Sequence, residues 1–96
     1  MAETRKTELF AKWIDGLKDV RARARILVRI ERLAGGNPGD VKPVGEGVSE
    51  LRIDYGPGYR VYYTQRRQSV IILPAGGEKR TQDRDIRTAL RLARNL

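Results

Sequence analysis

The first third of the chain places apolar residues at helical spacing. An apolar side chain recurs every three or four positions in its first segment, which predicts a short amphipathic helix. The residues that form this pattern are Phe10, Trp13, Ile14 and Leu17. Thr7 is expected to cap the helix, because threonine accepts a hydrogen bond from the first free N–H groups of a helix. Residues 3–6, before the cap, are expected to form a short strand or an extended arm.

A second helix is expected over residues 19–34, and residues 35–39 (GGNPG) end it. The broad apolar side that we expect to be buried consists of Val20, Ala24, Leu27, Ile30 and Ala34. An arginine stripe falls within an arc of roughly 80° at about 100° per residue, and it consists of Arg21, Arg25, Arg29 and Arg32. A solvated helix face is the simpler interpretation of this stripe, and contact with nucleic acid is the alternative.

The spacing changes to alternation in the second half of the chain, which predicts strands. Residues 39–47, rich in glycine and proline, are expected to form a loop. The strands are predicted at residues 48–55, 59–64 and 69–73, with turns at residues 56–58 and 65–68. The third strand is nearly all apolar and is therefore expected to be central. Pro74 is expected to end its regular ladder because proline has no N–H to donate.

A last helix is predicted to begin after Thr81 as N-cap, with Asp83 and Asp85 in its first turn. Its buried stripe is expected to be Ile86, Ala89, Leu90 and Ala93, and a second arginine ridge is Arg84, Arg87, Arg91 and Arg94. The element order βααβββα predicts one α+β domain over residues 1–96. Its small, mainly antiparallel sheet is expected to have the helices packed on one side.

Composition narrows the function. The 96 residues carry a net charge of +8, and 15 of the 20 basic residues are arginine. This balance favours a polyanionic partner, either nucleic acid or an acidic protein; a coding genome rich in G and C would explain the arginine bias but not the net charge. Histidine and cysteine are absent, which excludes disulfides, a thiolate nucleophile and the usual neutral-pH base. We expect no metal or cofactor, no membrane segment and a cytoplasmic protein.

The first predicted hairpin brings cations to one face. If Tyr55 pairs with Tyr59, pairing places Arg52 and Arg60 on the same side of the sheet, away from the helices. Asp54 and Tyr62 share that side, so a surface ion pair between Asp54 and Arg60 is the plainer interpretation.

The segment at residues 76–80 favours an anion site instead. Its two glycines would let a ligand backbone approach closely, Lys79 and Arg80 follow them, and the positive end of the last helix is near. Together with the arginine face, this arrangement predicts a phosphate-rich ligand.

The run ELRIDYGPGYRVYY, followed by GGEKRTQDRDI, closely resembles the phage-derived, Gp49-like and HigB-like branch of the RelE/ParE toxin superfamily. The N-terminal half fits as well, so the resemblance covers nearly the whole chain. It implies the RelE-like βααβββα fold and the toxin of a type II toxin–antitoxin system. It further implies a cognate antitoxin, of helix-turn-helix or HigA-like type, in a toxin–antitoxin hetero-oligomer.

In the RelE and HigB branches the resemblance implies ribosome-dependent, metal-independent cleavage of mRNA, which inhibits translation. The ribose 2′-hydroxyl attacks the scissile phosphate, and Arg60 matches the strand arginine placed there. Arg52 matches a neighbouring basic position, and Lys79 is the candidate for proton transfer or leaving-group stabilisation. The expected RNA-binding residues are Tyr62, Arg66, Arg67, Arg80 and Gln82. Two alternatives stay open: a ParE-like, non-enzymatic inhibitor of DNA gyrase, and an RNA-binding module without catalysis.

Overall fold

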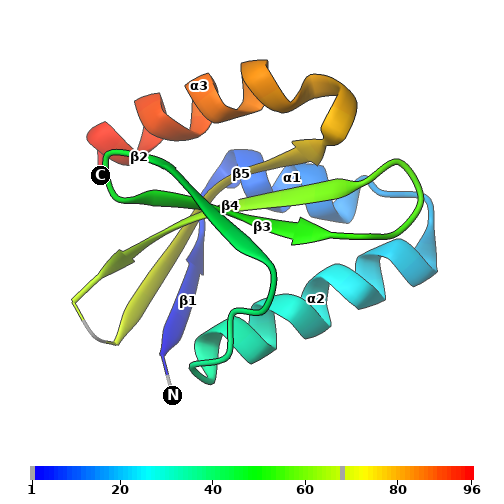
Figure 1. Ribbon diagram of the computed structural model, residues 1–96, viewed down its shortest axis with the longest axis horizontal. Coiled ribbons are helices and arrows are strands. Elements are labelled where there is room, and N and C mark those ends of the chain that lie inside the picture. The colour runs from blue at the N-terminus through cyan, green and yellow to red at the C-terminus, as the bar shows by residue number, and fades with distance from the viewer. Residues whose placement is uncertain (1, 68) are drawn as a thin grey trace.

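A five-stranded sheet forms the centre of the computed structural model, which describes residues 2–67 and 69–96. The strands are β1 (Glu3–Lys6), β2 (Val41–Gly45), β3 (Val48–Ile53), β4 (Tyr59–Arg66) and β5 (Val70–Glu78). The helices are α1 (Glu8–Asp15), α2 (Val20–Ala34) and α3 (Gln82–Arg94), with a short 3-10 turn, η1, at Lys79–Thr81. The strand order is β1-β5-β4-β3-β2, in which β1 runs parallel to β5 and the other pairs are antiparallel (Figure 1). The predicted α+β class is confirmed, with one strand more than expected.

The helices cover both faces of the sheet, so the prediction that they pack on one side is wrong. Figure 1 shows α3 above the sheet and α2 below it. The larger core, beneath α1 and α2, is built from Phe10, Ile14, Ala22, Ile26, Ile30, Leu33, Leu51, Ile53, Tyr59, Val61, Ile71 and Leu73. The smaller core, beneath α3, is built from Val48, Tyr62, Ala75, Ala89 and Ala93. Because strand residues alternate between faces, an apolar residue on each face of β3, β4 and β5 supplies both layers.

The cap of α1 and the stripe of α3 are as predicted. Thr7 Oγ1 accepts a hydrogen bond of 3.1 Å from the backbone N–H of Phe10. On α3, Ala89 and Ala93 are buried, and Ile86 and Leu90 are half-buried against the smaller core.

The predicted buried side of α2 is largely wrong. The residues that face the core are Ala22, Ile26, Ile30 and Leu33. Only Ile30 belongs to the predicted set, and Val20 and Leu27 keep 68% and 48% of their surface exposed. The helix carries apolar residues on two opposite sides, so spacing alone does not determine which side meets the sheet.

Residues 41–45 form the edge strand β2 rather than part of a loop. Pro43 is tolerated because an edge strand can leave a missing donor unpaired on its outer side. The turn into β3 is formed by Glu46 and Gly47, which have φ angles of 53° and 78°, as the tight turns that favour hairpins require.

The register of the β3–β4 hairpin differs from the prediction by two residues. Ile53 lies opposite Tyr59, and Arg52 lies opposite Arg60. A shift of two positions keeps every side chain on its face, whereas a shift of one would exchange the faces. The predicted grouping of Arg52, Arg60 and Tyr62 on one face is therefore confirmed despite the wrong pairing.

Strand β5 continues through Pro74 to Glu78, which contradicts the predicted end of the ladder. Leu73 and Pro74 together lie opposite the single residue Tyr63, so the strand carries a bulge there. The Pro74 carbonyl accepts a hydrogen bond of 2.7 Å from Thr7 Oγ1. The prediction that this strand lies inside the sheet is confirmed, because β5 pairs with β1 on one side and with β4 on the other.

The second predicted turn is shorter than expected, because β4 extends through Arg66. Gln68, which that turn was expected to include, lies outside the described residues. No helix in the described part of the chain is long and apolar enough to cross a membrane.

Candidate anion site at the end of the sheet

A polar hollow of about 390 Å³ lies where β3 ends and β4 begins. The residues that line it are Asp40, Arg52, Asp54, Gly56, Pro57, Gly58, Arg60 and Lys79. All three residues predicted to be catalytic, Arg52, Arg60 and Lys79, thus surround one space. They come from β3, β4 and the turn after β5.

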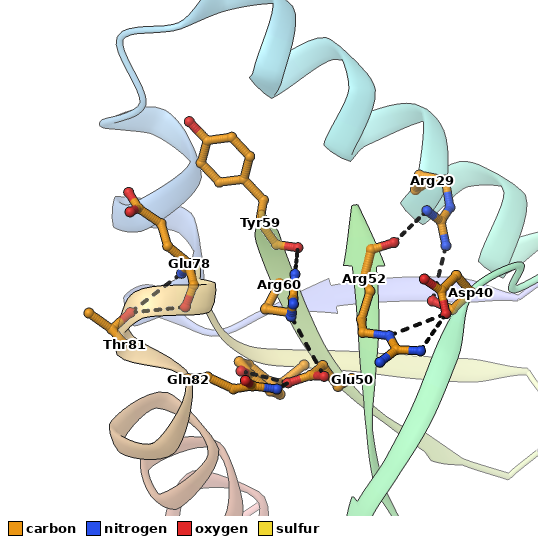
Figure 2. A network of polar contacts seen from close by, with 10 residues as sticks. Arg29, Asp40, Glu50, Arg52, Tyr59, Arg60, Glu78, Thr81 and Gln82 are labelled. Atoms are coloured by element: carbon orange, nitrogen blue, oxygen red, sulfur yellow. Dashed lines mark hydrogen bonds and ion pairs between the residues drawn. The ribbon is translucent and has the colours of Figure 1, made fainter. Parts of the chain in front are cut away.

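Arg52 and Arg60 stand directly opposite each other on adjacent strands. Like charges in this position destabilise a sheet, so each arginine needs compensation. Arg52 obtains it from Asp40, whose Oδ1 lies 2.8 Å from Nη2 and 3.2 Å from Nε (Figure 2). The Arg52 side chain is still 38% exposed, so part of its guanidinium faces solvent.

Arg29 of α2 positions the Arg52–Asp40 pair from the helix side. Its Nη1 donates to the Arg52 carbonyl at 2.7 Å, and its Nη2 donates to the Asp40 carbonyl at 3.3 Å (Figure 2). The same Nη2 also donates to the Pro38 carbonyl at 3.0 Å. A single side chain therefore joins α2, the loop before β2 and the end of β3. Arg29 belongs to the predicted arginine stripe, and the structure gives it a structural contact rather than a solvated position.

Arg60 lies above a buried carboxylate. Its Nε is 3.7 Å from Oε1 of Glu50, whose side chain has no solvent exposure, while the Arg60 side chain is 11% exposed. Neither of these two atoms has a hydrogen-bond partner among the residues that the structure describes. The other carboxylate oxygen, Oε2, accepts a hydrogen bond from Gln82 Nε2 at 2.7 Å (Figure 2). It also accepts one from Tyr62 Oη at 3.1 Å. The cation thus offsets the cost of burying the carboxylate, and the two hydrogen bonds fix the position of the carboxylate.

Tyr62 does not have the expected position at a solvent-facing surface. Its side chain is fully buried in the smaller core beneath α3. Burial raises the pKa of its hydroxyl far above the ordinary value of 10, and the negative charge of Glu50 raises it further. Tyr62 therefore supports Glu50 in this structure and does not offer a ring on which an RNA base could stack.

The two glycines before Lys79 serve packing inside the protein, which corrects their predicted role as a cradle for a ligand. Gly76 and Gly77 lie within β5. A Cβ atom on Gly76 would collide with the Trp13 ring of α1. A Cβ atom on Gly77 would collide with the carboxylate of Asp85 of α3. These glycines allow one helix to approach each face of the same strand.

The predicted cap of α3 also has a different role. Thr81 occupies the N-cap position, but its side chain accepts no capping hydrogen bond from a backbone N–H of α3 in the described residues. Its hydroxyl donates to Asp85 Oδ2 at 2.5 Å. The bond holds the buried Asp85 carboxylate, which packs over Gly77.

Lys79 lies between two hollows. Its backbone N–H donates to the Gly58 carbonyl at 2.8 Å, which joins the end of β5 to the β3–β4 turn. The second hollow, of about 410 Å³, is lined by Lys79, Arg80, Thr81, Gln82, Asp83, Arg84 and Arg87. The ion pairs found in residues 2–67 and 69–96 do not include Lys79, and Arg80 makes only an exposed pair with Glu78 at 3.7 Å. We call the exposed cations of this second hollow, Lys79, Arg80, Arg84 and Arg87, the basic ledge.

Arg66 and Arg67 are not brought to this site. They lie toward the other end of β4 and line a different hollow with Arg5, Val70, Ile72 and Leu96. The Nη2 of Arg66 donates to the carbonyl of Ala93 near the end of α3 at 2.9 Å. Of the predicted RNA-binding residues, Arg80 and Gln82 line the second hollow together with Lys79.

Two acidic residues of the site were not predicted. Glu50 and Asp40 supply the carboxylates that hold Arg60 and Arg52. Alternation along β3 could have identified Glu50, because residues two apart in a strand share a face. Asp40 precedes a strand that was not predicted, so nothing in the local pattern connected it to Arg52.

Two comparisons with known proteins match most of this chain. A model of the family described as "Phage derived protein Gp49-like" matches residues 12–95. An uncharacterized protein from Haemophilus influenzae is 48% identical over 94 residues, which cover 98% of this chain and 95% of that protein. The family match spans the hairpin, the hollow and the basic ledge.

Proposed function

Because the chain belongs to the phage-derived Gp49-like family, which suggests a toxin-type protein, we propose that it inhibits translation by cutting mRNA on the ribosome. The observation that carries the proposal is the convergence of Arg52, Arg60 and Lys79 on one hollow. Lys79 has no ion-pair partner in the part of the chain that the structure describes, and part of the Arg52 guanidinium faces solvent, so both cations can bind an anion. A phosphate of RNA is such an anion.

The proposed reaction is an internal transfer at phosphorus. The ribose 2′-hydroxyl loses its proton to solvent and forms an O2′–P bond, while the bond between phosphorus and the 5′-oxygen breaks. The products are a 2′,3′-cyclic phosphate and a free 5′-hydroxyl. Negative charge builds up on the phosphoryl oxygens in the transition state, so positioned cations lower the barrier.

Each cation has its own task in this proposal. Arg60 is nearly buried and held beside Glu50, so it is preorganised to contact the scissile phosphate. Arg52 is more exposed and holds a neighbouring phosphate. Lys79 lies at the open rim and gives a proton to the leaving 5′-oxygen. The basic ledge would contact the RNA or ribosomal RNA beyond the hollow.

The test is primer extension on a defined mRNA in a purified translation system. The protein is expected to produce discrete cuts within codons. The Arg60→Ala variant is expected to cut at least a hundredfold more slowly, since loss of one such charge contact costs about 3–4 kcal/mol. Arg91→Ala is the matched control, because Arg91 is an exposed arginine of α3 that lines neither hollow.

Three results would contradict the proposal. Intact mRNA together with gyrase-dependent DNA breaks would indicate the gyrase inhibitor. Binding of mRNA without any cut would indicate a module without catalysis. Equal loss of cutting in Arg60→Ala and Arg91→Ala would show that general charge, and not the hollow, matters.

A further inference from the structure

Helix α2 has a second apolar side that faces away from the core. It consists of Val20, Ala24, Leu27 and Val28, and we call it the α2 stripe. Val20, Leu27 and Val28 keep 68%, 48% and 45% of their surface exposed. At about 100° per residue the four positions lie within an arc of roughly 100°, on the side of the helix opposite its buried residues. Contiguous apolar side chains at a surface mark an interaction site more often than isolated ones do.

Unpaired arginines flank the α2 stripe. Helix α2 contains five arginines and one acidic residue, Glu31. Arg29 is turned inward, as described above, and the other four are Arg21, Arg23, Arg25 and Arg32. None of these four takes part in an ion pair found in the described residues. The guanidinium of Arg25 lies 4.7 Å from the centre of the Tyr55 ring, which orients it by a cation–π contact.

A hollow of about 430 Å³ adjoins the stripe. The residues that line it are Ala24, Arg25, Val28, Arg29, Arg32, Ile53 and Asp54. Ala24, Val28 and Ile53 provide apolar surface, and Arg25 and Arg32 provide positive charge. This lining suits an apolar side chain inserted from a neighbouring helix with acidic residues on either side.

We propose that the α2 stripe and its hollow bind an acidic amphipathic helix of a partner protein. Nucleic acid would pair with the arginines but would gain nothing from the exposed valines and leucine. A second copy of this chain, with its net charge of +8, would bring the same arginines face to face and repel. A bilayer surface usually recruits helices through aromatic or more extensive apolar faces, and the α2 stripe has no aromatic residue. This inference does not depend on the nuclease proposal.

The test uses the full chain and a synthetic helical peptide with leucine on one face and glutamate on the other. NMR titration is expected to shift the resonances of α2 and of Ile53–Tyr55. Leu27→Ser is expected to weaken binding about tenfold, because it removes one apolar side chain from the contact. Leu9→Ser is the matched control, since Leu9 on α1 is similarly exposed at 46%, and it is expected to change binding less than twofold. A peptide with lysine in place of glutamate is expected not to bind.

Several outcomes would overturn the proposal. Shifts confined to the hollow around Arg60, or equal weakening by both serine variants, would show that the acidic peptide binds only to general positive charge. Sedimentation that finds a dimer which Leu27→Ser dissociates would assign the α2 stripe to a second copy. Loss of RNA or of anionic-vesicle binding in Leu27→Ser, with peptide binding unchanged, would assign it to those ligands.

Discussion

Glu50 is a charged residue without solvent exposure, and three groups from β4 and α3 converge on it. Tyr62 and Gln82 donate hydrogen bonds to one of its oxygens, while Arg60 lies beside the other. A buried carboxylate is costly unless a cation and hydrogen bonds compensate it. The same carboxylate therefore stabilises the domain and fixes Arg60 at the floor of the hollow.

We predict that Glu50→Gln lowers the free energy of unfolding by about 2–3 kcal/mol, because Arg60 loses its counter-charge in a nearly buried position. The amide keeps the side-chain volume and an oxygen that can accept a hydrogen bond, so the fold is expected to survive. Urea titration followed by circular dichroism measures the change. Glu46→Gln is the control, since its pair with Arg94 is exposed, and its effect is expected to be much smaller. Equal effects of the two variants would contradict the role assigned to Glu50.

The raised pKa of the Tyr62 hydroxyl leads us to predict that the stability of the fold depends on pH. Burial and Glu50 raise the pKa of its hydroxyl in the folded protein above the unfolded value of 10. Below pH 10 both states hold the proton and stability is unaffected; above pH 10 only the unfolded state releases it, so stability falls as pH rises. The pKa of Tyr59 is raised as well, chiefly by burial, and Tyr59 adds to the same slope.

The expected result is that Tyr62→Phe makes the loss of stability above pH 10 shallower, by at most about 1.4 kcal/mol per pH unit. At neutral pH the variant is expected to be less stable by about 1–2 kcal/mol, because Glu50 loses a hydrogen bond. Urea titrations at pH 7, 10 and 11 measure both effects. Tyr63→Phe, a change at a half-buried neighbour, is the control. An unchanged slope in Tyr62→Phe would show that the Tyr62 hydroxyl is not protected from ionisation.

At the scale of elements, β5 brings the two helical layers together. Gly76 faces Trp13 of α1, and Gly77 faces Asp85 of α3. The strand ends in Lys79, whose N–H binds the β3–β4 turn. The site is therefore positioned by how closely the helices approach this strand.

We predict that Gly76→Ala destabilises the domain by about 2–3 kcal/mol, because the added methyl group overlaps the rigid Trp13 ring. Gly35→Ala is the matched control, since its Cβ would make only ordinary contacts at 3.5 Å and its φ is −81°. Thermal unfolding of both variants measures the difference. If Gly76→Ala kept its stability and lost only RNA binding, the glycine would be a ligand cradle after all.

The elements predicted best from sequence are those whose local pattern has one solution. Thr7 followed by apolar residues at helical spacing predicts the start of α1, and the alternation of Leu51 and Ile53 with polar residues predicts β3. The side of α2 that is buried could not be predicted, because apolar residues occupy two sides and only contact with the sheet selects Ile26 over Leu27. Strand β2 was missed because Pro43 and the nearby glycines indicate a loop unless the strand is known to lie at an edge.

The sequence predicted which side chains share a face at the candidate site, but not how deeply they are buried. Both outcomes have a physical reason. Side-chain direction in a strand depends only on odd or even position, so Arg52 and Arg60 fall on one face even with the wrong register. How deeply each of these side chains is buried depends on which helix covers that face of the sheet. Helix α3 was expected on the opposite face. Tyr62 was consequently placed at a surface and Glu50 was not identified, although both side chains are buried.

At the scale of the whole molecule, the positive charge is divided between the ends of β4. Arg60 and the basic ledge lie at one end, and Arg66 with Arg67 lies toward the other. Arg66 lies six positions after Arg60 along β4, which corresponds to about 20 Å at ~3.3 Å per strand residue. A single phosphate in the hollow therefore cannot contact Arg67, whereas a longer RNA that crosses the sheet can.

RNA length should accordingly distinguish the two ends. We predict that Arg67→Gln leaves the binding of a dinucleotide unchanged within about twofold, when a 2′-deoxy sugar at the first position prevents cleavage. The same variant is expected to weaken binding of a twelve-nucleotide RNA and to reduce its salt slope by about 0.7, the value for one phosphate contact on a single strand. Arg52→Gln is expected to weaken both ligands, because Arg52 lines the hollow itself. Fluorescence anisotropy across a salt series measures all four affinities. Weaker dinucleotide binding in Arg67→Gln would show that the two ends act as one site, and an unchanged salt slope for the longer RNA would remove Arg67 from the RNA path.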